Sequence, residues 1–317
     1  MLAILGITSP IFLLIGVGYL AMLGGIVTRP QVQGVGTFVL YCALPALVIR
    51  ALTQHPLQEV LNPHYLLAYG LGSVAIFAGA LLLTRRLQRK PLSASAMHAM
   101  GMAASNSGFV GYPVAAMVLG SPAAVFLAMN MLIENLLIIP AALILGELGN
   151  HSGVGFREAL RQTATRLARN PILIGLTVGV VFSASGLTLP GPVAKTIDML
   201  ASAAAPVALF VIGGTLYGLR TRGMAGDVGQ IVLGKLILHP LAVLLAFLSL
   251  PSLDPFLLAG ALLFASAPMI SVFPIFGQRY GLAGVSAAAL MMATLASFVT
   301  ISLTIWLLDT SGMIATH

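Results

Sequence analysis

Residues 105–113 read SNSGFVGYP, and they interrupt an apolar stretch from about Met97 to Leu119 that is long enough to span a membrane. Two serines, one asparagine, two glycines and one proline lie within these nine residues. Because glycine lowers helix stability and proline removes a backbone donor, the stretch predicts a helix that is broken inside the bilayer. Backbone amides and carbonyls at such a break are left free to bind something other than their own helix.

The composition of the chain is that of a polytopic membrane protein. Of its 317 residues, 59% are hydrophobic and 7% are charged, whereas a soluble domain would carry roughly a quarter charged residues. The single cysteine, Cys42, excludes a disulfide framework and a thiolate metal site, and no cofactor is expected. The first apolar run, near residues 4–23, lacks the basic start and the cleavage site of a signal peptide, so we expect it to be the first helix.

Apolar runs separated by proline, glycine and charged residues predict ten membrane-spanning helices. Continuous runs of this length indicate helices, because a β-barrel would show alternating segments of about ten residues. The expected spans lie near residues 4–24, 34–53, 63–84, 93–119, 123–146, 171–187, 193–218, 228–249, 255–278 and 283–308.

The basic residues fall almost entirely on one side of these spans. The odd-numbered connections hold 12 of the 15 Lys and Arg residues, the even-numbered ones hold only Arg50 and Lys195, and Lys235 lies within span eight. By the positive-inside rule, the odd connections are cytoplasmic and both termini lie outside the plasma (inner) membrane. The net charge of +7 therefore reflects orientation in the lipid bilayer, and no nucleic-acid partner is expected.

The longest connection, residues 151–170, carries a helical pattern of its own. Phe156, Leu160, Thr163 and Leu167 share one helical face with arginines around them, which indicates an amphipathic helix on the inner leaflet. The glycines before it do not predict a phosphate-binding loop, because neither a GK[ST] motif nor a preceding strand is present.

Residues separated by 161 positions match in a way that divides the chain into two halves. The matches are Pro10 and Pro171, Pro45 and Pro206, Pro113 and Pro274, Gly18 and Gly179, Ser105 and Ser266, and Gly120 and Gly281. They indicate five-helix repeats at residues 1–150 and 171–317, joined by the 151–170 linker. Because five is odd, the second repeat is inverted, and the expected fold is an all-α membrane protein of ten transmembrane helices in two inverted repeats.

The partner of the first break lies in span nine, where residues 265–274 read ASAPMISVFP. A half-helix that begins inside the membrane presents its positive end to an anion, whereas two simple proline kinks would need no ligand. We favour a binding site, because the breaks recur at equivalent places and Asn106 adds a side-chain donor and acceptor. The expected substrate-binding residues are Ser105, Asn106, Ser107, Gly108, Pro268, Met269, Ser271 and Asn130.

Three ionisable side chains are expected deep in the membrane. Glu134 on span five shares a helical face with Asn130, and Lys235 on span eight shares one with His239. Ionisable groups at this depth are costly, so these three are candidates for coupling transport to an ion. The alternative is that a buried Glu134–Lys235 pair, or separate hydrogen bonds, only fix the packing of the helices.

Five segments carry a resemblance to a known family, and they are FVLYCALPALV (38–48), SNSGFVGYP (105–113), RNPILIGLTVG (169–179), AAAPVALFVIGGTL (203–216) and GKLILHP (234–240). In order and spacing they resemble the auxin efflux carrier family, which includes bacterial malonate and malate permease-like members. The resemblance covers nearly the whole chain. It implies ten helices in two inverted repeats, broken helices four and nine that cross, a scaffold domain, and transport of organic carboxylates.

By position, Asn106 corresponds to the family's asparagine at the span-four crossover, and Pro268 to the proline at the span-nine break. Many relatives have a proline before that asparagine, where this chain has Ser105, and a polar residue after the second break, where it has Met269. The plant carriers have an acidic residue on span three, and residues 62–84 of this chain contain none. The resemblance therefore does not extend to an auxin-like substrate or to the plant members' proton coupling.

The sequence thus predicts a secondary active transporter that moves a small organic anion by alternating access. Proton symport through Glu134 is one mode of coupling, and sodium coupling and uncoupled transport are the alternatives. An enzyme is disfavoured, because no nucleophile with a base, aspartate pair or HExxH motif is present. A channel is disfavoured by the lack of a ring-forming charged filter. Association as a homodimer is left open.

Overall fold

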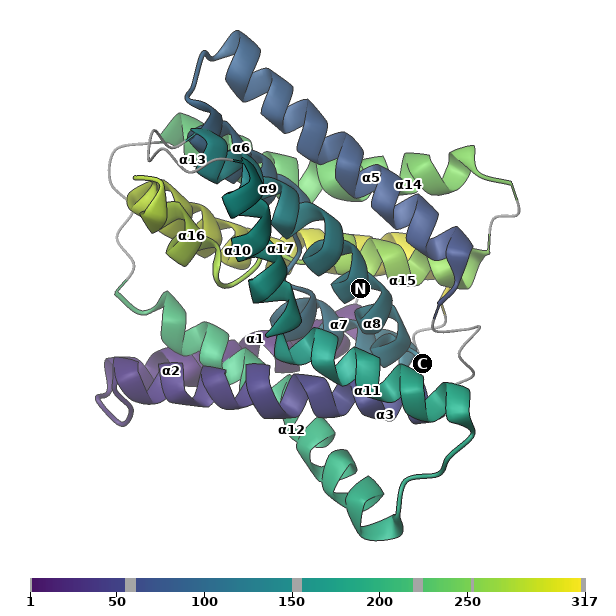
Figure 1. Cartoon of the computed structure of the whole chain (residues 1–317). Helices are drawn as coiled ribbons and strands as arrows, with labels where there is room; N and C mark the ends of the chain where they lie inside the picture. Colours follow the sequence, from purple (N-terminus) through teal and green to yellow (C-terminus); the bar gives the residue numbers. More distant parts are fainter. Residues whose placement is uncertain (1, 55–60, 150–155, 219–224, 252–253, 315–317) are drawn as a thin grey trace.

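A computed structural model describes residues 2–54, 61–149, 156–218, 225–251 and 254–314 of the chain (Figure 1). Throughout these ranges the regular structure is helical, and one isolated β-bridge is the exception, so the expected all-α class is confirmed. The α-helices are α1 (Leu2–Leu23), α2 (Arg29–Phe38), α3 (Leu44–Gln54), α5 (Pro63–Leu82), α6 (Leu92–Ala103), α7 (Tyr112–Leu119), α8 (Ala123–Ile133), α9 (Ile139–Gly149), α10 (Phe156–Ala168), α11 (Pro171–Ser185), α12 (Gly191–Leu216), α13 (Ala225–Leu233), α14 (His239–Ser249), α15 (Pro255–Ala265), α16 (Phe273–Arg279) and α17 (Ala283–Thr310).

Six continuous helical segments in the described ranges are long and apolar enough to cross a membrane, or seven if α10 and α11, which meet at a bend of 58°, are counted as one span. The six are Arg29–Gln54, Pro63–Leu87, Ala123–Gly149, Gly191–Leu216, Ala225–Ser249 and Ala283–Thr310. The predicted segments coincide with helices to within a few residues, and the two that were expected to be broken are the two that the structure divides, into α6 and α7 and into α15 and α16.

The described residues include five π-helical turns within or at the ends of these helices, and four of the turns end two residues before a proline. The turns are η1 (Val39–Ala43), η2 (Leu83–Leu87), η3 (Ser107–Gly111), η4 (Glu134–Ile138) and η5 (Gly234–Leu238). Pro45, Pro113, Pro140 and Pro240 follow η1, η3, η4 and η5. A proline ring clashes with the carbonyl four residues earlier, and the extra residue of a π-turn relieves that clash without ending the helix. Prolines that the sequence marks as interruptions are thus accommodated within continuous helices.

Helices from the two halves of the chain pack against each other rather than forming separate bodies. α1 lies along α12, α3 along α11, and α5 along α14. The α1–α12 contact is between backbones, because a Cβ added at Gly18 would lie 2.0 Å from Phe210 O and one added at Gly213 would lie 1.8 Å from Ile15 O. Small residues at a helix interface allow this close approach in a membrane, where apolar burial alone does not hold helices together.

The matched positions of the two halves agree best in the broken helices. Pro113 and Pro274 both stand in the first turn of the half-helix that follows the break, α7 and α16. Gly120 and Gly281 follow these half-helices with φ of 71° and 75°, a conformation that favours glycine. Pro10 and Pro171 differ, since Pro10 lies inside α1 and Pro171 begins α11.

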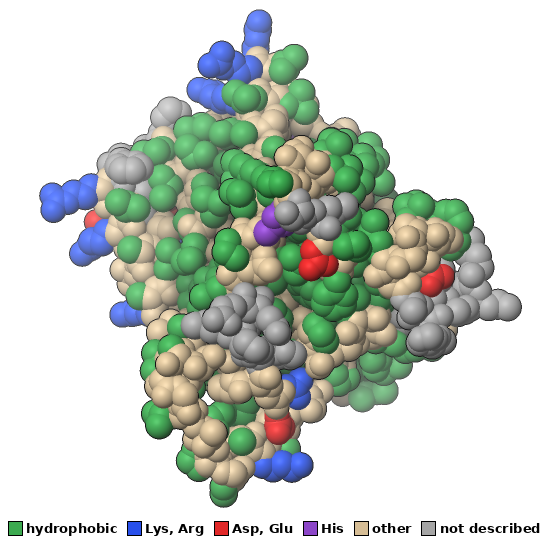
Figure 2. Space-filling model, turned by 90° about the vertical axis from the view of Figure 1, so that its right-hand side faces the viewer, with side chains coloured by type: hydrophobic (Ala, Val, Ile, Leu, Met, Phe, Trp, Pro, Cys, Tyr) green, Lys and Arg blue, Asp and Glu red, His purple; other side chains and the backbone are tan. Residues whose placement is uncertain are grey.

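The connections lie at opposite ends of the molecule. In Figure 1 those after α1 and α5 lie to the left, and the ends of α3, α11 and α14 lie to the right. At the left-hand end, Arg29 donates to Tyr217 O at 3.0 Å, and Lys90 forms an ion pair with Asp227. Figure 2 shows the right-hand face, on which hydrophobic side chains are widespread and Lys and Arg lie mostly toward the edges.

Candidate functional site at the helix crossover

The two broken helices meet at their breaks and pair through the backbone. Asn106 N donates to Pro268 O at 2.7 Å, and Ser105 forms an antiparallel β-bridge with Met269. The breaks leave some backbone N–H and C=O groups without helical partners, and some of these groups bond each other where the two helices cross. The first break lies at residues 104–106, and Pro113, which was expected to contribute to it, stands in the first turn of α7 instead.

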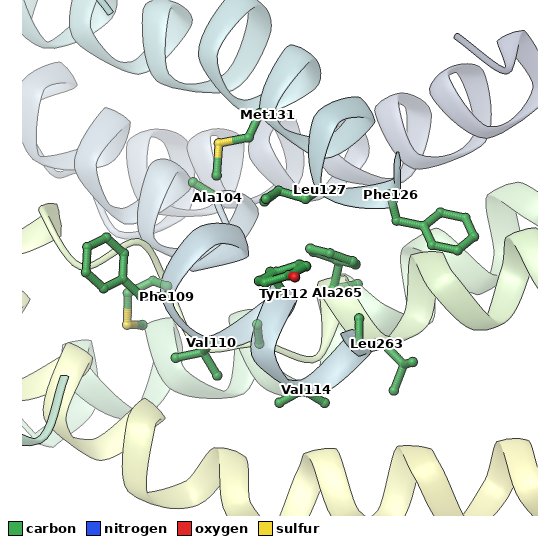
Figure 3. Close-up of a cluster of buried hydrophobic side chains, with 14 of the residues drawn as sticks. Ala104, Phe109, Val110, Tyr112, Val114, Phe126, Leu127, Met131, Leu263 and Ala265 are labelled. Carbon is green, nitrogen blue, oxygen red and sulfur yellow. The ribbon is translucent and has the colours of Figure 1, made fainter. Parts of the chain in front are cut away.

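The half-helix after the first break, η3 followed by α7, is packed tightly between the two halves. A Cβ added at Gly108 would lie 2.7 Å from Leu44 Cδ1, and one added at Gly111 would lie 2.8 Å from Phe264 Cδ1. Figure 3 shows apolar side chains of α8 on one side of this half-helix and Val114 directed to the other. The glycines of SNSGFVGYP are thus explained by close packing, and the serines and asparagine by the crossing.

A cavity of about 250 Å³ lies beside the crossover and reaches to α10 and the start of α11. Most of its wall is apolar and comes from η1, α3, η3, α8, η4, α9 and α16. The predicted site residues that line it are Ser105, Asn106, Ser107, Gly108, Ser271 and Glu134. Five substrate-binding candidates and one coupling candidate, which are scattered over 167 positions of sequence, therefore share one cavity.

Glu134 lies beside the start of the half-helix that begins at the crossover. It is 2% exposed, and its Oε1 accepts hydrogen bonds from Ser105 N at 3.0 Å and from Ser107 Oγ at 2.7 Å. The first N–H groups of a helix have no partner within the helix and carry its positive end, so a carboxylate is stabilised there. The turn η4 starts at this residue, and both Glu134 and the adjacent Asn135 line the cavity.

Asn106 joins the side chains of the two breaks. Its Nδ2 donates to Ser271 Oγ at 2.8 Å, and Asn106 is 3% exposed. Both residues line the cavity, so an amide and a hydroxyl from opposite halves of the chain meet on its wall. A bound carboxylate that replaced one of these partners would accept hydrogen bonds from the other.

The opposite side of the crossover holds Lys235, which does not line the cavity. Its Nζ donates to Ser105 Oγ at 2.7 Å, to His239 Nδ1 at 2.7 Å and to Ala265 O at 2.8 Å. An ammonium has three donors, and all three are used here by buried partners. His239 Nε2 then pairs with Ser73 Oγ at 3.0 Å, so the network continues to α5.

Glu134 and Lys235 do not form a direct ion pair in the described part of the chain, but they meet through one residue. The Ser105 backbone N–H donates a hydrogen bond to the Glu134 carboxylate, and the Ser105 hydroxyl oxygen accepts one from the Lys235 ammonium. Tyr69 OH also lies 3.2 Å from Ser105 Oγ. The crossover therefore has a carboxylate on its cavity side and an ammonium on its closed side.

Three of the candidate residues take other positions. Asn130 donates from Nδ2 to Tyr65 OH at 3.0 Å and does not line the cavity. Pro268 contributes its backbone carbonyl to the crossing, and the buried Met269 contributes the bridge to Ser105. None of the three presents a side chain on the cavity wall.

The wall also includes Asn170, which the sequence did not single out. Asn170 caps α11, with Oδ1 accepting from Ile172 N at 2.9 Å, and donates from Nδ2 to Asn135 Oδ1 at 2.8 Å. The Asn-Pro pair that begins α11 is a common helix-start signal and could have identified this cap. The expected helix in the linker is present as α10, and Thr163, Arg166 and Leu167 of its sequence line the cavity.

Comparison with known proteins gives two matches. A family model described as "Membrane transport protein" matches residues 4–307. A protein of Rhizobium meliloti (strain 1021) described as "Putative malonate transporter" is 30% identical over 316 residues, which cover 99% of this chain and 98% of that protein. Both the family and this relative are transporters, as the sequence predicted, rather than enzymes.

Proposed function

The chain belongs to the membrane transport protein family, the auxin efflux carrier-like group that its sequence resembles, and we propose that it moves small organic carboxylates across the plasma membrane by alternating access. The observation that carries this proposal is the position of the cavity. It lies beside a helix that begins inside the molecule, at the point where the two broken helices cross.

A carboxylate is the ligand whose chemistry fits this cavity. Ser107 begins a half-helix, and Asn106 and Ser271 provide neutral donors on the same wall. Helix N-termini and neutral hydrogen-bond donors bind anions without a countercharge. The name of the Rhizobium meliloti relative supports a malonate-like substrate.

The place that Glu134 occupies supports coupling to protons. Its carboxylate accepts hydrogen bonds from Ser105 and Ser107, at the helix end where a substrate carboxylate would bind. A substrate carboxylate bound at this helix end would be repelled by the carboxylate of Glu134, and a proton on Glu134 would remove the repulsion. We therefore favour proton symport, with sodium-coupled and uncoupled transport as the alternatives.

The architecture we propose is two inverted five-helix repeats, at residues 1–150 and 171–317, joined by the linker that contains α10. The crossed packing supports it, since α1 lies along α12 and α11 along α3. The cavity extends to α10, in the connection that the positive-inside rule assigns to the cytoplasm, which supports an inward-facing state. The group formed by α1, α3, α11 and α12 would then move against the remaining helices and open the cavity to the other side of the membrane.

Two measurements on the purified protein test this function. In a thermal-shift screen of monocarboxylates and dicarboxylates, a substrate should raise the melting temperature, because a ligand that binds the native state stabilises it. In proteoliposomes, internal unlabelled substrate should drive uptake of the labelled compound by counterflow. Binding without counterflow would exclude a carrier, and an absence of any carboxylate binding would exclude the proposed substrate class.

A further inference from the structure

We propose that Arg166 on α10 is a specificity-determining residue that binds the second carboxylate of a dicarboxylate substrate. This inference rests on the proposed function, because it assumes that one carboxylate binds at the crossover. It assigns the far end of the same cavity, where the wall is formed by α10 and the start of α11.

Few of the side chains on the cavity wall are charged, and Arg166 is one of them. Among the described residues that line the cavity, Arg166 is the one cation and Glu134 is the one acid. Glu134 is held at the crossover by Ser105 and Ser107, whereas Arg166 comes from α10, which is not part of the crossover. An anion that extends from the crossover toward α10 therefore meets a positive charge.

Other polar groups near Arg166 are already occupied. Asn170 uses Oδ1 to cap α11 and Nδ2 to donate to Asn135 Oδ1, and Asn135 Nδ2 donates to Met131 O at 2.9 Å. These bonds fix the turn from α10 to α11 against η4, so they hold the end of α10 beside the cavity. The guanidinium of Arg166 remains as the strong donor at this end of the wall.

The acid that could neutralise Arg166 is paired elsewhere. Glu147 accepts from Tyr280 OH at 2.8 Å and forms an ion pair with Arg279 at 2.6 Å. Burial, together with the hydrogen bond to Glu147, raises the pKa of the Tyr280 phenol above its ordinary value, so this hydroxyl is a neutral donor. Among the described residues, the Arg166 side chain has no hydrogen-bond or ion-pair partner.

The arrangement predicts a preference between substrates that differ by one carboxylate. A guanidinium can bind a carboxylate through two parallel hydrogen bonds, and bonds to charged groups contribute more than neutral ones. A short dicarboxylate such as malonate would use both ends of the cavity, whereas a monocarboxylate such as propionate would use the crossover end alone. Arg166 should therefore affect the affinity for the first much more than for the second.

The experiment compares Arg166→Gln with Arg169→Gln for binding of malonate and propionate to the purified full-length protein. Arg169 follows α10 and is exposed, as Arg166 is, but it does not line the cavity, so its substitution removes the same charge from the same end of the molecule. We expect Arg166→Gln to raise the Kd for malonate about tenfold or more, and the Kd for propionate by less than about threefold. Arg169→Gln should leave both within about threefold of the wild type.

Three outcomes would overturn the inference. Equal losses in the two variants would show that only the surface potential attracts the anion, and equal losses for malonate and propionate would place Arg166 at a site common to both. Retention of malonate affinity in Arg166→Gln would remove its role altogether. If the wild type binds neither malonate nor propionate, that result contradicts the proposed function itself and not only the role of Arg166. Arg166→Lys, which keeps the charge but loses the planar fork, should recover part of the malonate affinity.

Discussion

The two sides of the crossover use the same residue for opposite purposes. On the cavity side, the Ser105 amide holds the carboxylate of Glu134, and on the closed side the Ser105 hydroxyl holds the ammonium of Lys235. Glu134 lines a cavity that a ligand could enter, whereas Lys235 and His239 lie among buried partners away from it. An ionisable side chain deep in a membrane protein is therefore not by itself a transport residue, and its access to the cavity makes the distinction.

The largest effect is expected from removing the ammonium on the closed side. Lys235→Met would remove the ammonium that bonds Ala265 O, Ser105 Oγ and His239 Nδ1, and it would leave Glu134 without a nearby positive charge. Breaking a buried charged network by removing one partner typically costs roughly 3–5 kcal/mol. We expect a large fall in thermal stability in detergent, whereas Glu134→Gln should fold nearly as well, because a glutamine oxygen can still accept from Ser105 and Ser107. A similar fall in melting temperature in Lys235→Met and Glu134→Gln would show that the two sides of the crossover contribute equally to stability.

The next effect concerns the neutral donors of the cavity. Asn106→Ala removes the amide that donates to Ser271 Oγ, and we expect it to weaken carboxylate binding by about tenfold or more while the crossing of the backbones remains. Isothermal titration with the best substrate of the thermal-shift screen measures the loss, and circular dichroism checks the fold. A folded Asn106→Ala variant with the wild-type Kd would show that the substrate does not bind at the crossover.

Asn130→Ala provides the matched control and the smallest effect. Asn130 is as deeply buried as Asn106, but it pairs with Tyr65 away from the cavity. Interhelical hydrogen bonds in membrane proteins contribute about 0.6 kcal/mol on average, so the melting temperature should fall slightly. The Kd for the carboxylate should stay unchanged in the same titration, and a loss equal to that of Asn106→Ala would place Asn130 within the binding site after all.

The helices and both breaks could be predicted from sequence because they depend on local composition. Apolar runs of membrane length indicate spans, and glycine, serine and proline at residues 105–113 and 265–274 indicate where two of them are interrupted. The position of Pro113 within α7 was missed, because a π-turn rather than a break accommodates that proline. The number of membrane crossings, the inverted repeats and the placement of both termini stay predictions.

The two sides of the crossover could not be told apart from sequence. Glu134 and Lys235 are both isolated charges in apolar segments, and which of them faces a cavity depends on the contact between helices that lie more than 100 residues apart in the chain. Arg166 was counted only as one of the cytoplasmic charges, since an arginine on the surface of α10 looks the same in sequence whether or not it lines a cavity. Asn130 shares a helical face with Glu134 but lies one turn away, beside Tyr65.

Transport by Glu134→Gln in proteoliposomes tests most directly whether the carboxyl group at the crossover carries the coupling proton. A neutral glutamine keeps the hydrogen bonds to the half-helix but cannot load or release a proton, so counterflow of labelled malonate should continue while accumulation driven by a pH gradient is lost. Glu147→Gln, which removes the other buried acid of the same continuous helical segment, should retain both activities. Undiminished accumulation driven by the pH gradient in Glu134→Gln would contradict this account and would leave sodium coupling or facilitated exchange as the mechanism.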